Sequence, residues 1–169
     1  DPLGIISLHD ADREMSVVTQ WESKSMSFCE ASPCLGDENL IAMPCREEAH
    51  VAIRDCRVAP LCPPAFRFHG GGITDPTKSR QCGMLTSLGM HSVGSKAVTV
   101  CGMENGSLYV HELAMPSQRD LTHKNNSQKY VATCSLGTDP ILSLDLSLSS
   151  STQQNYGFVA VAGLGGDAA

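Results

Sequence analysis

The sequence predicts an all-β protein built from a repeated unit of strands. Three short segments share one register: a small first residue, apolar third and fifth positions, and a terminal carboxylate. They are residues 4–10, 49–55 and 106–112. Alternation with a period of two is typical of a strand with one buried face. Because no stretch of ten or more residues has the periodicity of an amphipathic helix, we expect strands throughout.

The spacing of these strands indicates the size of the unit. Their acidic ends, Asp10, Asp55 and Glu112, lie 45 and 57 residues apart. A repeat of about 40–45 residues is typical of the four-stranded blades of a β-propeller, and the longer second interval predicts an insertion. One blade cannot bury both faces of its sheet, so blades stack into a closed ring of roughly 4–8.

Further β-type runs supply the other strands of each unit. Asn105-Gly106 predicts a tight hairpin turn, because both residues tolerate positive φ. The remaining strands are expected in three groups: first strands at 26–28, 85–88 and 141–146, second strands at 40–44, 97–102 and 158–163, and fourth strands at 15–19, 65–68 and 130–134.

The units divide the chain into successive parts. We expect the second half of a blade in residues 1–22, a blade in 23–68, an inter-blade loop in 69–82, a blade in 83–135, and the first half of a blade in 136–169. These parts amount to about three blades, too few for the ring of roughly 4–8 that closes a propeller. We therefore expect the chain to be a piece of a longer protein, with apolar blade faces and strand edges exposed when it is alone.

The segment from Glu104 to Glu112 resembles the end of a WD repeat. His111-Glu112 stands where the name-giving Trp-Asp would fall, and His9-Asp10 and Arg54-Asp55 occupy the same place in the other copies. The order of the segments 25–29, 40–44, 102–113 and 139–145 is similar to that of guanine nucleotide-binding protein subunit beta-like proteins, whose fungal relatives are the ASTRA-associated proteins.

That resemblance implies a seven-bladed WD-repeat propeller, of which this chain would supply about three blades. It also implies a non-catalytic scaffold or adaptor in the nucleus and cytoplasm that mediates protein–protein interactions. The implied partners are the Tel2-Tti1-Tti2-type co-chaperone assembly, which matures phosphatidylinositol-3-kinase-related kinases, and subunits of chromatin-associated ASTRA complexes.

Composition narrows the partner classes independently of any resemblance. Twelve Lys and Arg against eighteen Asp and Glu give a net charge of −6, which argues against nucleic acid and against an anionic membrane surface. No apolar run approaches the ~18 residues of a membrane-spanning helix. Cys45 and Cys101 lie in apolar runs, so we expect buried free thiols and a reducing compartment.

Two glycine motifs support an alternative, an enzyme. His69-Gly70-Gly71-Gly72 is similar to an oxyanion-hole loop, but the chain has no Gly-x-Ser-x-Gly to supply a nucleophile. The turn from Gly163 to Ala168 fits the dinucleotide fingerprint, which requires a helix and a βαβ unit around it. Because an all-β setting provides neither, we predict no catalytic and no cofactor-binding residues.

Other chemistry-bearing residues have simpler interpretations. The repeat carboxylates lie a blade apart, so they cannot share one site, and we expect them to accept backbone N–H bonds at strand ends. The cysteine spacings lack the close pairs of zinc sites, so no metal is predicted. Trp21, the only tryptophan, either packs between blades or anchors a partner. The long insertion from Cys56 to Gly83 is where a functional loop is expected.

Overall fold

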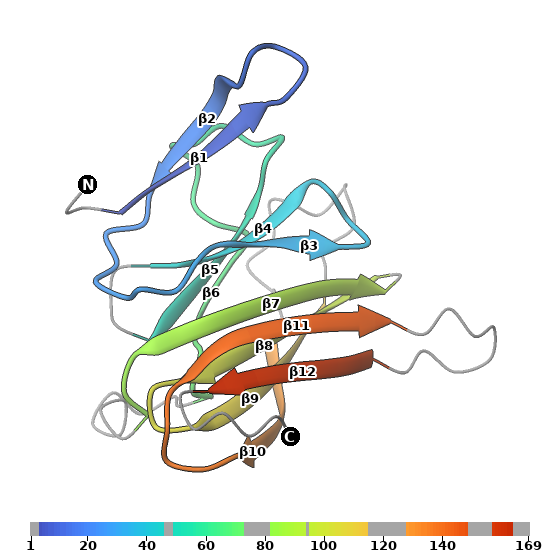
Figure 1. Cartoon of the computed structure of the whole chain (residues 1–169). Coiled ribbons are helices and arrows are strands. Elements are labelled where there is room, and N and C mark those ends of the chain that lie inside the picture. The colour runs from blue at the N-terminus through green and yellow to red at the C-terminus, as the bar shows by residue number, and fades with distance from the viewer. Residues whose placement is uncertain are drawn as a thin grey trace.

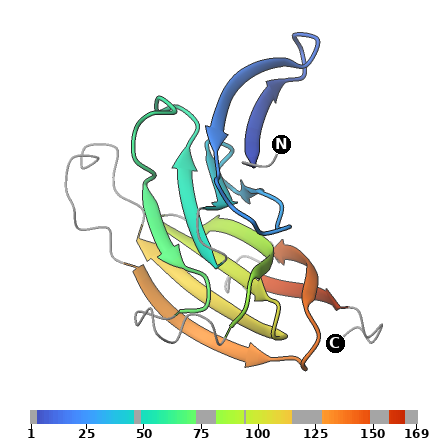
Figure 2. The ribbon, with the colours of Figure 1, turned by 90° about the vertical axis from the view of Figure 1, so that its left-hand side faces the viewer.

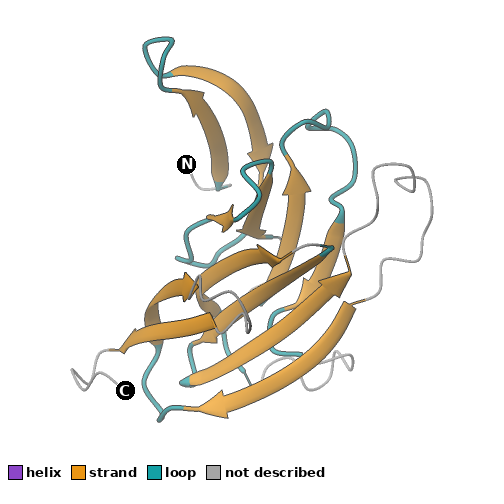
Figure 3. Ribbon diagram, turned by 90° about the vertical axis from the view of Figure 1, so that its right-hand side faces the viewer, coloured by secondary structure: helices purple, strands orange, loops and turns teal. Residues whose placement is uncertain are grey.

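The computed structural model describes residues 4–45, 49–72, 82–93, 95–114, 128–148 and 157–163. In these ranges the chain forms strands, turns and extended segments and no helix, which confirms the all-β prediction (Figure 3). Accordingly, no helix able to cross a membrane occurs in the ranges just given.

Twelve strands in the described ranges form three hydrogen-bonded sheets (Figure 1). They are a β1–β2 hairpin, a curled sheet of eight strands in the order β10-β9-β8-β7-β3-β4-β5-β6, and a β11–β12 pair. The strands are β1 (Ile5–Asp10), β2 (Ser16–Glu22), β3 (Ser32–Leu35), β4 (Leu40–Pro44), β5 (His50–Asp55), β6 (Phe66–His69), β7 (Leu85–Val93), β8 (Lys96–Met103), β9 (Ser107–Ala114), β10 (Gln128–Ser135), β11 (Ile141–Leu148) and β12 (Gly157–Gly163).

The eight-stranded sheet consists of two antiparallel meanders, β3 to β6 and β7 to β10. They meet through their first strands, because β3 pairs parallel with β7 at Cys34 and Met90. Strand β11 lies on β7, where the Ser87 hydroxyl donates to the Ile141 carbonyl at 2.7 Å (Figure 1). Strands β3, β7 and β11 thus follow one another, an arrangement compatible with part of a β-propeller.

Three separate apolar clusters join the successive layers of strands. The hairpin cluster connects β1–β2 to the first meander, the central cluster lies between the two meanders, and the third cluster connects the second meander to β11. Figure 2 shows the hairpin standing beside the first meander. Buried members include Trp21, Met43 and Ala52 in the hairpin cluster, Val51, Phe68, Leu85 and Cys101 in the central cluster, and Val100, Leu108 and Ile141 in the third.

Strict alternation explains how one strand can serve two clusters. In β4, Leu40 and Ala42 belong to the central cluster, whereas Ile41 and Met43 on the opposite face belong to the hairpin cluster. Successive side chains of a strand point to opposite faces, so a strand between two layers is apolar at every position. Continuous apolar runs in this sequence therefore mark the strands that are covered on both faces.

The predicted first strand at residues 26–28 is wrong. The strand begins only at Ser32, and residues 23–31 belong to no strand. The hydroxyls of Ser23, Ser25 and Ser27 accept the backbone N–H two residues ahead, at 3.1, 3.1 and 3.0 Å. Such local side-chain bonds compete with the ladder of a sheet, and the apolar pattern alone does not reveal them.

The predicted hairpin turn at Asn105-Gly106 is confirmed. It joins β8 to β9, with Gly106 at φ +74° and its N–H donating to the Met103 carbonyl at 3.1 Å. A side chain at this glycine would place its Cβ 2.6 Å from the Gly137 carbonyl oxygen. Both the positive φ and the close backbone therefore require glycine at this position.

Candidate functional site

The repeat carboxylates make short-range contacts in separate parts of the fold. Asp10 and Asp55 each accept the backbone N–H two residues later at 2.9 Å, as expected for strand ends. Hydrogen bonds from Arg57 hold the pKa of Asp55 below its usual value. Glu112 differs, because β9 continues past it to Ala114, and it pairs instead with the Lys96 ammonium at 2.9 Å.

The residue before each of these carboxylates binds a backbone carbonyl. His9 Nδ1 lies 2.7 Å from the Met15 oxygen, and Arg54 Nη1 lies 2.7 Å from the Cys62 oxygen. His111 Nε2 lies 2.7 Å from the Gly70 oxygen. Because a carbonyl only accepts, the ring nitrogen of each histidine is the donor. This repeat position therefore holds loops in place.

The His69-Gly70-Gly71-Gly72 segment is a closed turn after β6. Its three glycine N–H groups donate to the Ala49 carbonyl at 2.7 Å, the His69 ring at 3.0 Å and the His69 carbonyl at 3.0 Å. An oxyanion hole requires N–H groups that are free to meet the substrate. This turn has none to offer.

The other predicted glycine motif lies almost entirely outside the described residues. Only Gly163 is described, as the last residue of β12, and residues 164–168 are not. Strand β12 runs antiparallel to β11. A dinucleotide site of the predicted type needs parallel strands connected by a helix.

The eight cysteines are free, and Cys45 and Cys101 are buried as predicted. Burial, and to a smaller extent the Glu30 carboxylate, raises the pKa of the Cys29 thiol to about 12. Cys62 and Cys134 are exposed. Among the residues with described positions, no three His, Cys, Asp or Glu side chains gather closely enough to hold a metal ion.

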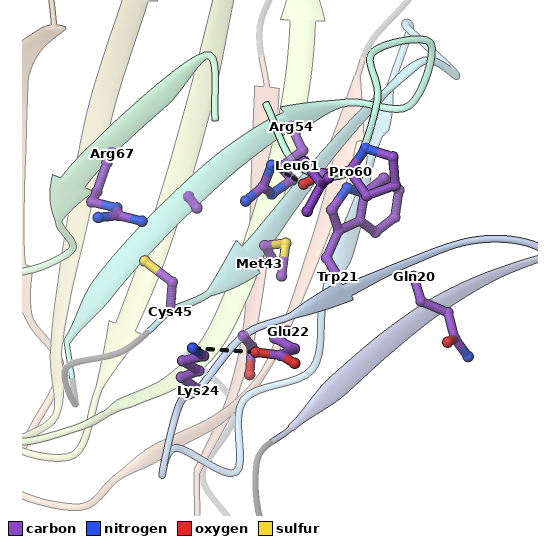
Figure 4. Close-up of a pocket in the computed structure, with 12 residues that line it drawn as sticks. Gln20, Trp21, Glu22, Lys24, Met43, Cys45, Arg54, Pro60, Leu61 and Arg67 are labelled. Carbon is purple, nitrogen blue, oxygen red and sulfur yellow. Dashed lines mark hydrogen bonds and ion pairs between the residues drawn. The ribbon is translucent and has the colours of Figure 1, made fainter. Parts of the chain in front are cut away.

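A cleft of about 570 Å³ lies between the β1–β2 hairpin and the first meander (Figure 4). Its floor consists of Met43, Cys45 and Ala52, all buried. Trp21, which is 3% exposed, forms one wall, so the tryptophan packs between layers and also borders the cleft. The volume of the cleft is in the range of sites that bind small ligands or single side chains.

Strand register places the two arginines of the cleft on the same face of the first meander. Arg67 of β6 pairs with Ala52 of β5, and Arg54 lies two residues beyond Ala52, on the same face. Figure 4 shows the two guanidinium groups and the Lys24 ammonium placed around Met43 and Cys45. The remaining lining residues are Gln20, Glu22, Ser23, Pro60 and Leu61.

The cleft is positively charged. Lys24 pairs with Glu22 at 3.2 Å, and no other carboxylate lines it among the described residues. Burial, and next the nearby Arg67, lowers the pKa of the Arg54 guanidinium from its usual value. Lys24 itself has φ +53°, a conformation uncommon outside glycine that persists where the surroundings fix it.

Sequence reasoning missed this cleft, although a signal was present. Arg67 stands between Phe66 and Phe68 in a strand whose phenylalanines enter the central cluster. Alternation therefore places Arg67 on the opposite face, toward the hairpin cluster. What the sequence does not show is that Arg54 lies beside it.

The chain matches no protein-family model and no curated protein.

Proposed function

We propose that this chain is part of a WD-repeat β-propeller and acts as a non-catalytic scaffold or adaptor for protein partners. One observation carries the proposal: four layers of antiparallel strands are joined in series by three apolar clusters. Stacked blades bury their faces in this way. About three blades of a seven-bladed ring would correspond to the two meanders and the two flanking strand pairs.

Side chains on the loops support the adaptor part of the proposal. Leu61 is fully exposed on the Cys56–Gly83 insertion, and Phe28 is 90% exposed before β3. Large apolar side chains on loops of a stable scaffold are typical of contact sites for other proteins. A hydrogen bond fixes the backbone next to each of these side chains. Ser27, beside Phe28, donates to the Leu85 carbonyl, and Arg54 donates to the carbonyl of Cys62, beside Leu61.

The partners proposed come from the family resemblance. They are the Tel2-Tti1-Tti2-type co-chaperone assembly and ASTRA complex subunits, with the protein acting in nucleus and cytoplasm. Purification of the protein, tagged at its endogenous level, should enrich these subunits over an untagged control when measured by quantitative mass spectrometry. Recovery of none of them would refute this choice of partner, and recovery of no stoichiometric protein at all would refute the adaptor function.

A further inference from the structure

We infer that the cleft between the β1–β2 hairpin and the first meander binds an acidic peptide segment of a protein partner. One carboxylate would lie between the guanidinium groups of Arg54 and Arg67, and a neighbouring apolar side chain would lie against Leu61 and Pro60. The inference rests on the proposed adaptor function and adds the chemistry of the bound segment.

Charge is the first argument. The whole chain carries −6, yet Lys24, Arg54 and Arg67 gather around one cleft. Glu22 offsets Lys24 through their 3.2 Å contact, which leaves both arginines without a carboxylate among the described lining residues. A cleft of this charge attracts anions and disfavours cationic or neutral segments.

The environment of Arg54 is the second argument. Its Nη1 donates to the Cys62 and Pro60 carbonyls at 2.7 and 3.3 Å, and these bonds fix the guanidinium in the lining of the cleft. A guanidinium held in place loses little freedom on binding, and a carboxylate is the anion whose two oxygens match its geometry. Arg67 on the adjacent strand supplies a second guanidinium to the lining of the same cleft.

The mouth of the cleft indicates that the anion belongs to a peptide. Leu61 is 100% exposed and Pro60 is exposed beside it, on a loop that Arg54 ties to the sheet. A free inorganic anion would gain nothing from these apolar groups, whereas an apolar side chain next to a Glu or Asp would cover them. Nucleic acid is disfavoured, because the chain as a whole repels a polyanion.

Trp21 makes the inference directly measurable, because it is the only tryptophan and it lines the cleft. The probe is the blocked hexapeptide Gly-Glu-Leu-Glu-Leu-Gly, titrated against the protein while tryptophan fluorescence is recorded. The reference probe is the same peptide with Gln in place of both Glu. We expect a saturable change with the acidic peptide, and at least about tenfold weaker binding of the Gln peptide, as for loss of charge-assisted hydrogen bonds.

Two variants of equal charge locate the site. Arg67→Gln alters an exposed side chain in the cleft and should weaken acidic-peptide binding about three- to tenfold, as for one partly exposed charged contact. Arg13→Gln removes the same charge from the distant β1–β2 turn and should change nothing. Leu61→Ser should also weaken binding, without loss of fold because that side chain is fully exposed.

Any of three results overturns the inference. The first is equal binding of the two peptides, and the second is an unchanged affinity of Arg67→Gln for the acidic peptide. The third comes from adding inorganic phosphate or free glutamate as a competitor, and it is displacement of the acidic peptide by less phosphate than glutamate. Co-purification separates this failure from that of the proposed function. If Arg67→Gln recovers the same partners as the natural protein, the cleft assignment fails and the adaptor stands. If neither recovers a partner while the peptide titration succeeds, the adaptor function fails, and the cleft is a site for acidic peptides with no adaptor role.

Discussion

Replacing His111 with Phe tests how the two meanders are held together. His111 is fully buried in β9, and its Nε2 donates to the Gly70 carbonyl in the turn after β6. Its ring also packs on Phe68, with centroids 4.7 Å apart. The His111→Phe variant keeps a planar ring in contact with Phe68 and removes the ring N–H. The substitution therefore removes the hydrogen bond that crosses from one meander to the other.

The expected loss follows from the burial of the acceptor. Gly70 is buried, so bulk water cannot replace the lost histidine as the hydrogen-bond donor to its carbonyl. A buried acceptor deprived of its donor costs about 1–3 kcal/mol. With a urea dependence of about 1–3 kcal/mol per molar, the unfolding midpoint should fall by about 1 M.

Urea unfolding followed by Trp21 fluorescence measures this change. The matched control is His9→Phe, because His9 makes the same type of bond, to the Met15 carbonyl at 2.7 Å, but is exposed. An exposed carbonyl regains water, so the control should lose less than about 0.5 kcal/mol. If the two variants were equally stable, the cross-meander hydrogen bond would contribute nothing and the reasoning would be refuted.

Two further outcomes are expected. Burial lowers the pKa of both His91 and His111 below 6.5, so the folded state binds fewer protons than the unfolded state. Their contribution to the free energy of unfolding should be fully present above pH 6.5 and should be lost as the pH falls below that value. A urea midpoint that is constant from pH 7.5 to 5 would contradict this. Gly102→Ala would place a Cβ against the Ser87 hydroxyl, its nearest neighbour, and 2.8 Å from the Ile141 Cγ2, and should cost about 1–3 kcal/mol through overpacking among β7, β8 and β11. A thermal midpoint equal to that of the natural protein would show that these strands are not packed so closely.

Most of the strands could be predicted because local pattern determines them. In residues 49–55 the apolar third and fifth positions alternate with the period of a strand, and the structure has strand β5 (His50–Asp55) there. The error at residues 26–28 arose where Ser25 and Ser27 bond to the backbone locally, a competition that hydrophobic alternation does not encode.

The cleft could not be predicted, because it depends on contacts between residues that are distant in sequence. The face occupied by Arg67 follows from alternation between two phenylalanines. Its position beside Arg54 depends on the register between β5 and β6, and the wall formed by Trp21 depends on how the hairpin packs. Register and packing are set by the summed fit of many side chains, which no single motif displays.

The residue before the repeat carboxylate differs between two layer boundaries. The boundary between the hairpin and the first meander holds the cleft, whereas the boundary between the two meanders holds a buried contact. In the third repeat strand, His111 reaches the carbonyl of Gly70, the residue directly after the last strand of the preceding meander. In the second repeat strand, the equivalent Arg54 bonds instead to Cys62 in its own following loop. Ser23, the residue directly after β2, lines the cleft. At this repeat position Arg54 thus adds a positive charge to the lining of the cleft, whereas the shorter His111 makes the buried contact at the next layer boundary.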